Sequence, residues 1–231
     1  MRTQTIQFPA YQAPCVFPEK IDDLGEAISA LGLKINYPVI VLIGGNIYDE
    51  HLEVTQRAIQ GIAKAAEDLG ALIICGGTMG VMAVIAEVRA QHQYQFPLVG
   101  MAPERKVTWP NGPKSRRFLW WGEERCDLAS GYSHFILVPG EEFGDESPWI
   151  TEAAKYFSQG NKSVTVLMNG GKVSRRDIEL SLKDSRPVIA VSGTGRFADE
   201  LANQEKRHEL IKIVPANDER AFAETIRGFL V

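Results

Sequence analysis

A glycine-rich turn after an apolar stretch is the part of the sequence whose residue types best suit ligand chemistry. The apolar residues 72–75 lead into the turn and a helical pattern: Gly76, Gly77, Thr78, Met79, Gly80 and Val81. Glycine lets a ligand approach where a Cβ atom would be in the way. The first N–H groups of a helix lack partners within it, and the helix dipole favours an anion there. We expect Thr78 to cap this helix and the turn to bind a phosphate; the alternative is a plain strand-to-helix turn.

Similar turns follow other apolar stretches. They contain Gly44, Gly45 and Asn46; Gly140, Phe143, Gly144 and Glu146; Gly170 and Gly171; and Gly193, Thr194, Gly195 and Arg196. The apolar stretches alternate with helical patterns from residue 39 to the end, which predicts an α/β fold: a Rossmann-like, doubly wound, mainly parallel sheet with helices on both faces. Because the connections between parallel strands are right-handed crossovers, all these turns lie at the carboxyl edge of such a sheet, where nucleotides bind.

The expected elements follow from hydrophobic periodicity. Strands are expected at 39–43, 72–75, 98–101, 134–138, 164–168, 188–191 and 210–214, and helices at about 49–69, 81–89, 147–159, 174–184, 197–202 and 217–229. Ser174 and Asp177 resemble a capping box, and Asn217 suits the cap of the last helix. Residues 1–37, with prolines and one short helix at 21–33, are expected to form an N-terminal extension that packs on the core. Residues 38–231 then form the ligand-binding domain.

Residues 104–132 show no regular pattern. Basic and aromatic side chains alternate within them: Arg105, Lys106, Trp109, Lys114, Arg116, Arg117, Phe118, Trp120, Trp121 and Arg125. A loop this long inside a compact domain is usually functional. It suits a lid over a nucleotide; the alternative is a solvated excursion whose tryptophans are buried against the domain or a second subunit.

Composition narrows the classes of function. The 231 residues carry a net charge of −4, whereas a nucleic-acid-binding domain is usually basic. The cysteines and histidines are scattered, so we expect no disulfide, no metal site and a reducing compartment. Residues after Met1 form no signal peptide, and no apolar run is long enough to cross a bilayer, which predicts a cytoplasmic protein with no membrane partner. The G-x-G-x-x-G fingerprint and the Walker A motif are absent.

Four motifs in register resemble the SLOG superfamily, which groups the LOG (lysine-decarboxylase-like) proteins with DprA/Smf. The closest likeness is the branch that forms the N-terminal cytosolic region of melastatin-type TRP channels and occurs alone in prokaryotes. The motifs are residues 75–81 (CGGTMGV), 132–138 (YSHFILV), 143–148 (FGDESP) and 192–196 (SGTGR) with Ala198 and Asp199. They cover roughly residues 38–202.

The resemblance implies a Rossmann-like domain that binds nucleotides or derivatives such as ADP-ribose and NAD-related ligands. It places Gly76, Gly77, Thr78 and Gly80 at the phosphate, Gly144 and Glu146 at the ribose, and Gly193, Gly195 and Arg196 at the rim. The enzymatic LOG branch cleaves the N-glycosidic bond of nucleoside monophosphates with a P-G-G-x-G-T-x-x-E motif. Pro139, Gly140 and Gly144 fit that motif, but Asp145 stands where threonine is expected.

Three hypotheses follow. The first is a sensor-type protein that binds a nucleotide derivative, needs no cofactor, and is not an enzyme. The second is an N-glycosidic hydrolase of nucleoside phosphates or NAD-related molecules, with Glu146 as the catalytic residue. The third is a scaffold that binds no ligand. The apolar helix 81–89 and the tryptophan-rich loop would suit the interface of a homo-oligomer.

Overall fold

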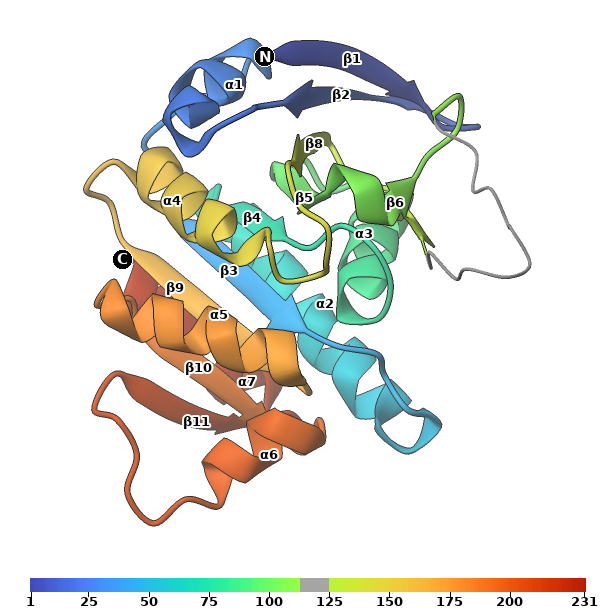
Figure 1. Ribbon diagram of the computed structural model, residues 1–231. Helices are drawn as coiled ribbons and strands as arrows, with labels where there is room; N and C mark the ends of the chain where they lie inside the picture. The colour runs from blue at the N-terminus through green and yellow to red at the C-terminus, as the bar shows by residue number, and fades with distance from the viewer. Residues whose placement is uncertain (113–124) are drawn as a thin grey trace.

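The computed structural model describes residues 1–112 and 125–231, and a nine-stranded sheet runs through it (Figure 1). In chain order its strands are β1 (Arg2–Gln7), β2 (Gln12–Phe17), β3 (Val39–Gly44), β4 (Leu72–Cys75), β5 (Leu98–Pro103), β8 (His134–Val138), β9 (Ser163–Met168), β10 (Val188–Ser192) and β11 (Ile211–Pro215). Their spatial order is β1-β2-β8-β5-β4-β3-β9-β10-β11. Neighbouring strands are parallel except β1 and β2, which are antiparallel.

The chain changes direction at β3. From β3 it proceeds through β4, β5 and β8 on one side, and then returns to β9, β10 and β11 on the other. The carboxyl end of β3 is therefore a topological switch point, flanked by β4 and β9, and open α/β sheets bind their ligands at such points. The expected Rossmann-like, mainly parallel sheet is confirmed.

Helices cover both faces of the sheet (Figure 1). They are α1 (Leu24–Ala30), α2 (Leu52–Leu69), α3 (Val81–Gln91), α4 (Ser147–Ser158), α5 (Lys172–Lys183), α6 (Arg196–Ala202) and α7 (Glu219–Leu230). Buried side chains form one core with α2, α3 and α7 and a second core with α1, α4, α5 and α6. Strand β3 alternates between them: Ile40 and Leu42 face the first, and Val39 and Val41 face the second.

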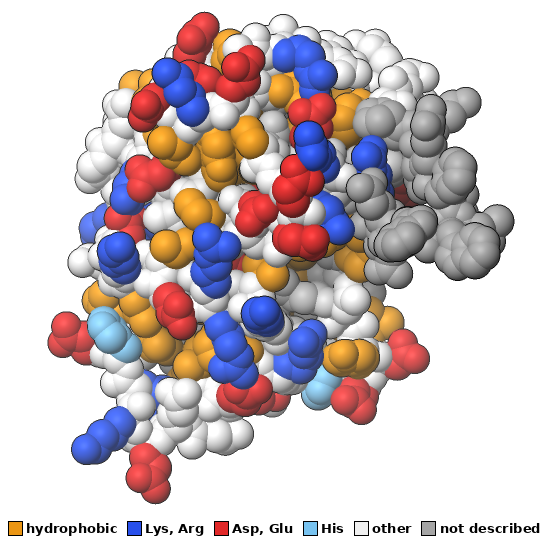
Figure 2. Space-filling model, viewed as in Figure 1, with side chains coloured by type: hydrophobic (Ala, Val, Ile, Leu, Met, Phe, Trp, Pro, Cys, Tyr) orange, Lys and Arg blue, Asp and Glu red, His pale blue; other side chains and the backbone are white. Residues whose placement is uncertain are grey.

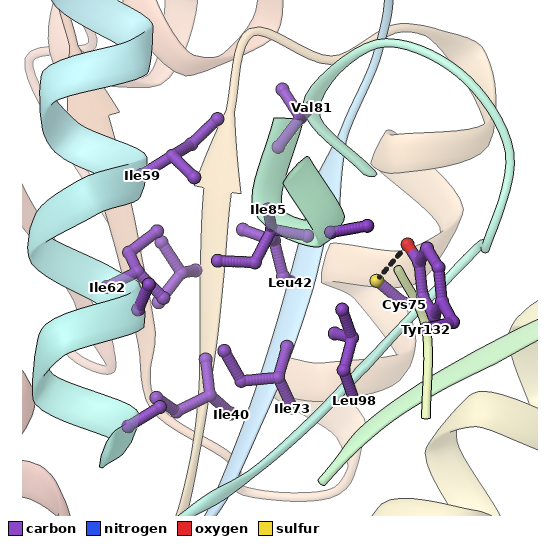
Figure 3. Close-up of a cluster of buried hydrophobic side chains, with 14 of the residues drawn as sticks. Ile40, Leu42, Ile59, Ile62, Ile73, Cys75, Val81, Ile85, Leu98 and Tyr132 are labelled. Atoms are coloured by element: carbon purple, nitrogen blue, oxygen red, sulfur yellow. Dashed lines mark hydrogen bonds between the residues drawn. The ribbon is translucent and has the colours of Figure 1, made fainter. Parts of the chain in front are cut away.

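The first core is tightly packed against the sheet, as Figure 3 shows for α2 and α3. Ile59 and Ile62 of α2 and Ile85 of α3 are fully buried on it. Each such side chain contributes about 1.5–3 kcal/mol by leaving water. The Cys75 thiol at the end of β4 lies 3.0 Å from the Tyr132 hydroxyl, which ties the start of the glycine turn to the core.

The first 37 residues contribute two strands to the sheet. The antiparallel pair β1 and β2 is joined to it through β2, where Cys15 and Val16 pair with β8. Pro14, which cannot donate a backbone hydrogen bond, lies just before this pairing and opposite Thr5 of β1. The other two prolines of this segment, Pro9 and Pro18, lie outside both strands.

Three expected helix caps are wrong. Helix α3 begins at Val81 after Gly80, whose φ of 68° only glycine adopts without strain, so Thr78 is not the cap. Helix α5 begins at Lys172, and the Ser174 hydroxyl accepts the N–H of Gly171. Asp218, rather than its neighbour Asn217, caps α7, because its carboxylate accepts the Ala221 N–H at 2.9 Å.

The region expected to be irregular, 104–132, holds short ordered pieces in its described part. Residues Glu104–Lys106 form a 3₁₀ turn, and β6 (Val107–Thr108) pairs in parallel with β7 (Cys126–Asp127). Trp109 is buried against Phe17. The other aromatic residues of the proposed lid, Phe118, Trp120 and Trp121, lie outside the described residues, as do Lys114, Arg116 and Arg117.

Within the described residues, no helix combines the length and the apolar character needed to cross a membrane. Across residues 1–112 and 125–231 there is also no cluster of His, Cys, Asp and Glu side chains arranged to hold a metal ion.

Candidate functional site

A cavity of about 370 Å³ opens at the switch point, at the carboxyl ends of β3 and β4. Its apolar wall consists of Leu42, Ile43, Met79, Met82, Phe143, Ile150 and Val173. Its polar wall consists of Asn46, Thr78, Cys126, Glu146, Lys172, Ser174, Asp177 and Arg196, with backbone at Gly44, Gly45, Gly76 and Gly171. A concave, mainly apolar site with a few placed polar groups is typical of a small-molecule site.

The structure brings part of the predicted site together. The expected residues that line the cavity are Gly44, Gly45, Asn46, Gly76, Thr78, Met79, Phe143, Glu146 and Arg196. The expected residues that do not line it are Gly77, Gly80, Val81, Gly140, Gly144, Gly193, Thr194 and Gly195. Geometry explains the division, because the residues of the second group pack against the chain or bond to it.

Two glycines of the first turn serve close packing of the chain. A Cβ atom on Gly80 would lie 2.3 Å from the carbonyl oxygen of Gly45, and one on Gly77 would lie 3.0 Å from the Cα of Gly100. The Gly45 carbonyl also accepts the N–H of Val81 at 3.2 Å. One of the first N–H groups of α3 is therefore already bonded to the protein.

Gly45 and Gly76 are different, because a Cβ atom on either would make only ordinary van der Waals contacts. A Cβ atom on Gly76 would meet the Met82 side chain at 3.7 Å, an ordinary contact. One on Gly45 would meet the Arg196 guanidinium at 3.4 Å. These two glycines therefore present bare backbone to the cavity.

The protein's own carboxylates fill two of the other glycine turns. Asp199 accepts the N–H groups of Gly193 and Gly195, at 2.6 and 3.0 Å. Asp145 accepts those of Glu141 and Glu142, at 2.9 and 3.1 Å. Successive backbone N–H groups of this kind form concave anion-binding sites. Here the protein's own aspartate side chains occupy them. The aspartate at position 145, where LOG proteins are expected to carry threonine, is thus part of the loop's own structure.

Glu146 is the most deeply buried acid of the cavity, with 7% of its surface exposed. Its carboxylate accepts the N–H of Gly144 at 2.6 Å, which fixes the side chain. Burial raises the pKa of Glu146 to about 7, against the lowering effect of backbone N–H groups of Glu146 and Gly144 and with a smaller contribution from the charges of Asp177 and Asp145. Near neutral pH this group therefore exists in both protonation states.

Asp177 is a cavity residue that the sequence interpretation assigned to a helix cap. Because α5 begins at Lys172, Asp177 lies in its second turn, one turn beyond Val173 and on the same face. Burial raises its pKa to about 6, against the opposing effects of the Ser147 hydroxyl and the Arg176 charge. Helical spacing from Val173 was the signal that would have found it.

The start of α5 provides the positive side of the cavity. Lys172 and Arg196 line it, and neither forms a hydrogen bond or ion pair through its side chain with the described parts of the chain. Their neighbour Arg175 pairs with Glu200, and Arg176 donates to the carbonyl of Gly144 at 3.0 Å. Figure 2 shows Lys and Arg side chains gathered where α5 and α6 begin. Two cations without a carboxylate partner beside a helix N-terminus favour an anion.

Arg196 is held in an unusual conformation. Its φ is 52°, a left-handed value that non-glycine residues seldom adopt, and it follows Gly195 at φ 91°. The guanidinium lies beside Gly171, where a Cβ atom would come within 2.7 Å of Nη2. Gly171 thus makes room for this arginine at the cavity wall.

Comparison with known proteins identifies the family of the chain. The family model described as "SLOG in TRPM, prokaryote" matches residues 37–226. The chain belongs to this family. The resemblance seen in the sequence motifs is therefore confirmed, and membership of this family supports a nucleotide-related function.

Relatives of this family member include two curated ion channels. Transient receptor potential cation channel subfamily M member 2 of Mus musculus is 27% identical over 206 residues, which cover 74% of this chain and 13% of the channel. The same channel of Rattus norvegicus matches equally, at 27% identity and the same coverage. The chain thus spans about an eighth of the length of these relatives.

A solved structure shares the fold. The structural-genomics target TM1055 superposes with a TM-score of 0.58 at 16% identity, over 83% of this chain and 99% of that one. At this identity the likeness concerns the fold alone.

Proposed function

We propose that this SLOG domain binds a nucleotide or nucleotide derivative in the cavity at the carboxyl ends of β3 and β4, and acts as a sensor of that ligand. The observation that carries the proposal is the division of the cavity wall into an apolar part and two cations without a carboxylate partner. A nucleotide has the same division into an apolar base and an anionic phosphate. AMP, ADP-ribose and NAD-related molecules are the candidate ligands, and no cofactor is required.

The available donors indicate which way the ligand lies. The backbone N–H groups at 141–142 and 193–195 bond to Asp145 and Asp199, and the Val81 N–H bonds to Gly45. Lys172, Arg196 and the first N–H groups of α5 lie together on one side. We place the phosphate there and the base against the apolar side chains of Met79, Met82 and Phe143. The ribose then lies between them, near Glu146.

Calorimetric titration with AMP, ADP-ribose and adenosine tests this proposal. We expect AMP and ADP-ribose to bind and adenosine, which lacks the phosphate, to bind at least tenfold more weakly. Arg196→Gln should reduce the affinity for AMP toward that for adenosine, because a bidentate, charge-assisted contact is lost. Equal affinities for AMP and adenosine in the wild-type protein would contradict the phosphate site.

A second function is favoured by one observation, the burial of Glu146 in the cavity with its pKa near 7. A carboxyl group that is partly protonated at neutral pH suits general acid–base work on a glycosidic bond. In this hypothesis water attacks the ribose C1′, the C–N bond breaks and the base leaves with a proton. Incubation with each ligand followed by chromatography tests it: free base and ribose phosphate should form, and Glu146→Gln should abolish them. If a ligand binds and no product forms, the hydrolase hypothesis is wrong and the sensor hypothesis stands.

A sensor must pass on the binding event, and a change in oligomeric state is one way to do so. We expect nucleotide binding to change the mass of the particle in solution, measured by light scattering after size exclusion with and without the ligand. An unchanged mass would point to a separate partner protein instead. A chain that binds no nucleotide at all would be a scaffold.

A further inference from the structure

The cavity contains two carboxyl groups that come from different elements. Glu146 comes from the residue just before α4, and Asp177 from the second turn of α5. In the described structure neither forms an ion pair. The nearest arginine in sequence, Arg176, is turned to the carbonyl of Gly144. A buried acid and a partly buried acid without a salt bridge are costly, so their presence needs a reason.

A hydroxyl between the two acids is also poorly satisfied. The Ser147 side chain has 1% of its surface exposed, and its Oγ forms no well-shaped hydrogen bond within the described structure. It nevertheless lies close enough to the Asp177 carboxyl to lower the pKa of that group. Glu146, Ser147 and Asp177 therefore form a polar cluster whose hydrogen-bonding capacity is not used up by the protein.

From this cluster we propose that Asp177 acts with Glu146 as the specificity-determining pair that recognises the vicinal diol of a ribose. This inference rests on the proposed nucleotide site and goes beyond it, because it makes the cavity selective for ribonucleotides. Glu146, fixed by the Gly144 N–H, lines the cavity from the residue before α4, and Asp177 lines it from α5. A diol offers two O–H donors and two acceptor oxygens and carries no charge.

The protonation of the pair suits this role. Burial raises the pKa of Glu146 to about 7 and that of Asp177 to about 6, so near neutral pH the pair holds on average less than two negative charges. The charged groups that face it are Asp145 on its own loop, Arg176 on α5, and the cavity cations Lys172 and Arg196. A carboxyl and a carboxylate together provide both a donor and acceptors to the two hydroxyl groups.

The position in the cavity agrees with this assignment. The proposed phosphate site is formed by Lys172 at the start of α5 and Arg196 at the start of α6, and Asp177 lies further along α5. A ligand whose phosphate is held at Lys172 would bring the adjoining sugar along α5 toward Asp177. The apolar side chains of Met79, Met82 and Phe143 remain for the base.

The test compares AMP with 2′-deoxy-AMP and 3′-deoxy-AMP by calorimetric titration at pH 6.5, with chromatography to show that the nucleotides stay intact. The wild-type chain should bind AMP at least tenfold more tightly than one of the deoxy forms, because the missing hydroxyl leaves a buried carboxyl unpaired. In Asp177→Asn the affinity for AMP should fall while that for this deoxy form changes little, so the discrimination should shrink below threefold.

Glu179→Gln is the matched control, since it removes an acid from an exposed position of the same helix. It should leave both affinities unchanged. Equal binding of AMP and both deoxy forms by the wild-type chain, or full discrimination in Asp177→Asn, would overturn the assignment of the diol to Asp177. Loss of all nucleotide binding in the wild-type chain would overturn the proposed function as well, so the two failures are distinguishable.

Discussion

Gly80 lies directly against Gly45, so that the glycine turn after β4 closes on the turn after β3. A Cβ atom at Gly80 would approach the Gly45 carbonyl oxygen to 2.3 Å, and the backbone of Gly80 is left-handed, with a φ of 68°. The contact joins two turns of the cavity wall. This glycine is required by the packing of the chain, whether or not a ligand is bound.

Substitution of Gly80 should therefore unfold or strongly destabilise the protein. We expect Gly80→Ala to lower the free energy of unfolding by at least 2 kcal/mol, through the clash and the strained backbone, as measured by urea denaturation. Gly80→Asp would add a charge to the same clash, so it is not a clean test of binding.

Unlike a substitution of Gly80, Gly76→Ala should test ligand binding in a protein that still folds. Its methyl group would meet Met82 at ordinary van der Waals distance, so the free energy of unfolding should change by less than about 1 kcal/mol. The methyl group would point into the cavity and weaken nucleotide binding, measured by titration. Unchanged affinity in a folded Gly76→Ala protein would mean that the ligand does not approach this turn.

Nucleotide binding should depend on salt through the cations at the start of α5. Lys172→Gln should weaken the binding of AMP and make its affinity less sensitive to salt between 50 and 500 mM, because one charge contact is lost. Lys183→Gln, which removes an exposed lysine at the other end of α5, is the control. A similar loss of AMP affinity in both variants would mean that the overall positive charge of the helix matters, rather than a contact between Lys172 and the phosphate.

Much of the fold was predictable because its strands are buried on both faces. Strands β3, β4, β5, β8, β9, β10 and β11 were predicted from apolar runs such as 39–43 and 134–138, and the glycine turns were correctly placed at the carboxyl edge of the sheet. The short strands β6 and β7 were missed, and so were the two N-terminal strands. Their order beside β8 depends on a pairing of only Cys15 and Val16, which leaves no hydrophobic pattern in the sequence.

The site was predictable only in part, because residue type does not reveal what a group already binds. The turn at 193–195 carries the glycines of an anion site, yet Asp199 fills it from the next helix. Asp177 was assigned to a cap because the start of α5 was placed too late. A shift of the helix start by two residues is a usual error, and it moved this acid from the cap to the cavity wall.

The burial of Glu146 predicts a pH dependence of stability. Its pKa is raised from 4.5 to about 7, so between these values the folded state binds more protons than the unfolded state and stability falls as the pH rises. Glu146→Gln should remove the contribution of this carboxyl group to the pH dependence of stability. We expect the variant to be more stable than the wild-type protein by about 2–3 kcal/mol at pH 8 and similar to it at pH 4.

Denaturation at several pH values measures this difference. His134, whose pKa burial lowers to about 4, changes stability in the opposite sense, but it is present in both proteins and cancels. A constant difference between the variant and the wild-type protein from pH 4 to 8 would contradict the raised pKa of Glu146.

The reactivity of the cysteine thiols provides an independent test of where the ligand binds. Cys15 and Cys75 are buried, which raises the pKa of each thiol and makes both slow to react, whereas Cys126 lines the cavity and is partly exposed. A thiol reagent should therefore modify Cys126 first, as mass spectrometry of Cys126→Ser can verify. Saturating ADP-ribose or AMP should slow this reaction. Equal rates with and without a bound nucleotide would place the ligand elsewhere.

The measurement that tests the central claim most directly is thermal unfolding with AMP, ADP, ATP, NAD, ADP-ribose and cyclic ADP-ribose, for the wild-type chain and for Lys172→Gln/Arg196→Gln. A ligand at about 100 times its Kd stabilises the folded state by about 2.7 kcal/mol, or a Tm rise of roughly 5–10 °C in a chain of this size. We predict such a rise with at least one ligand for the wild-type chain and its loss in the double variant. No rise with any of the six, or the same rise in both proteins, would contradict a nucleotide site at this cavity.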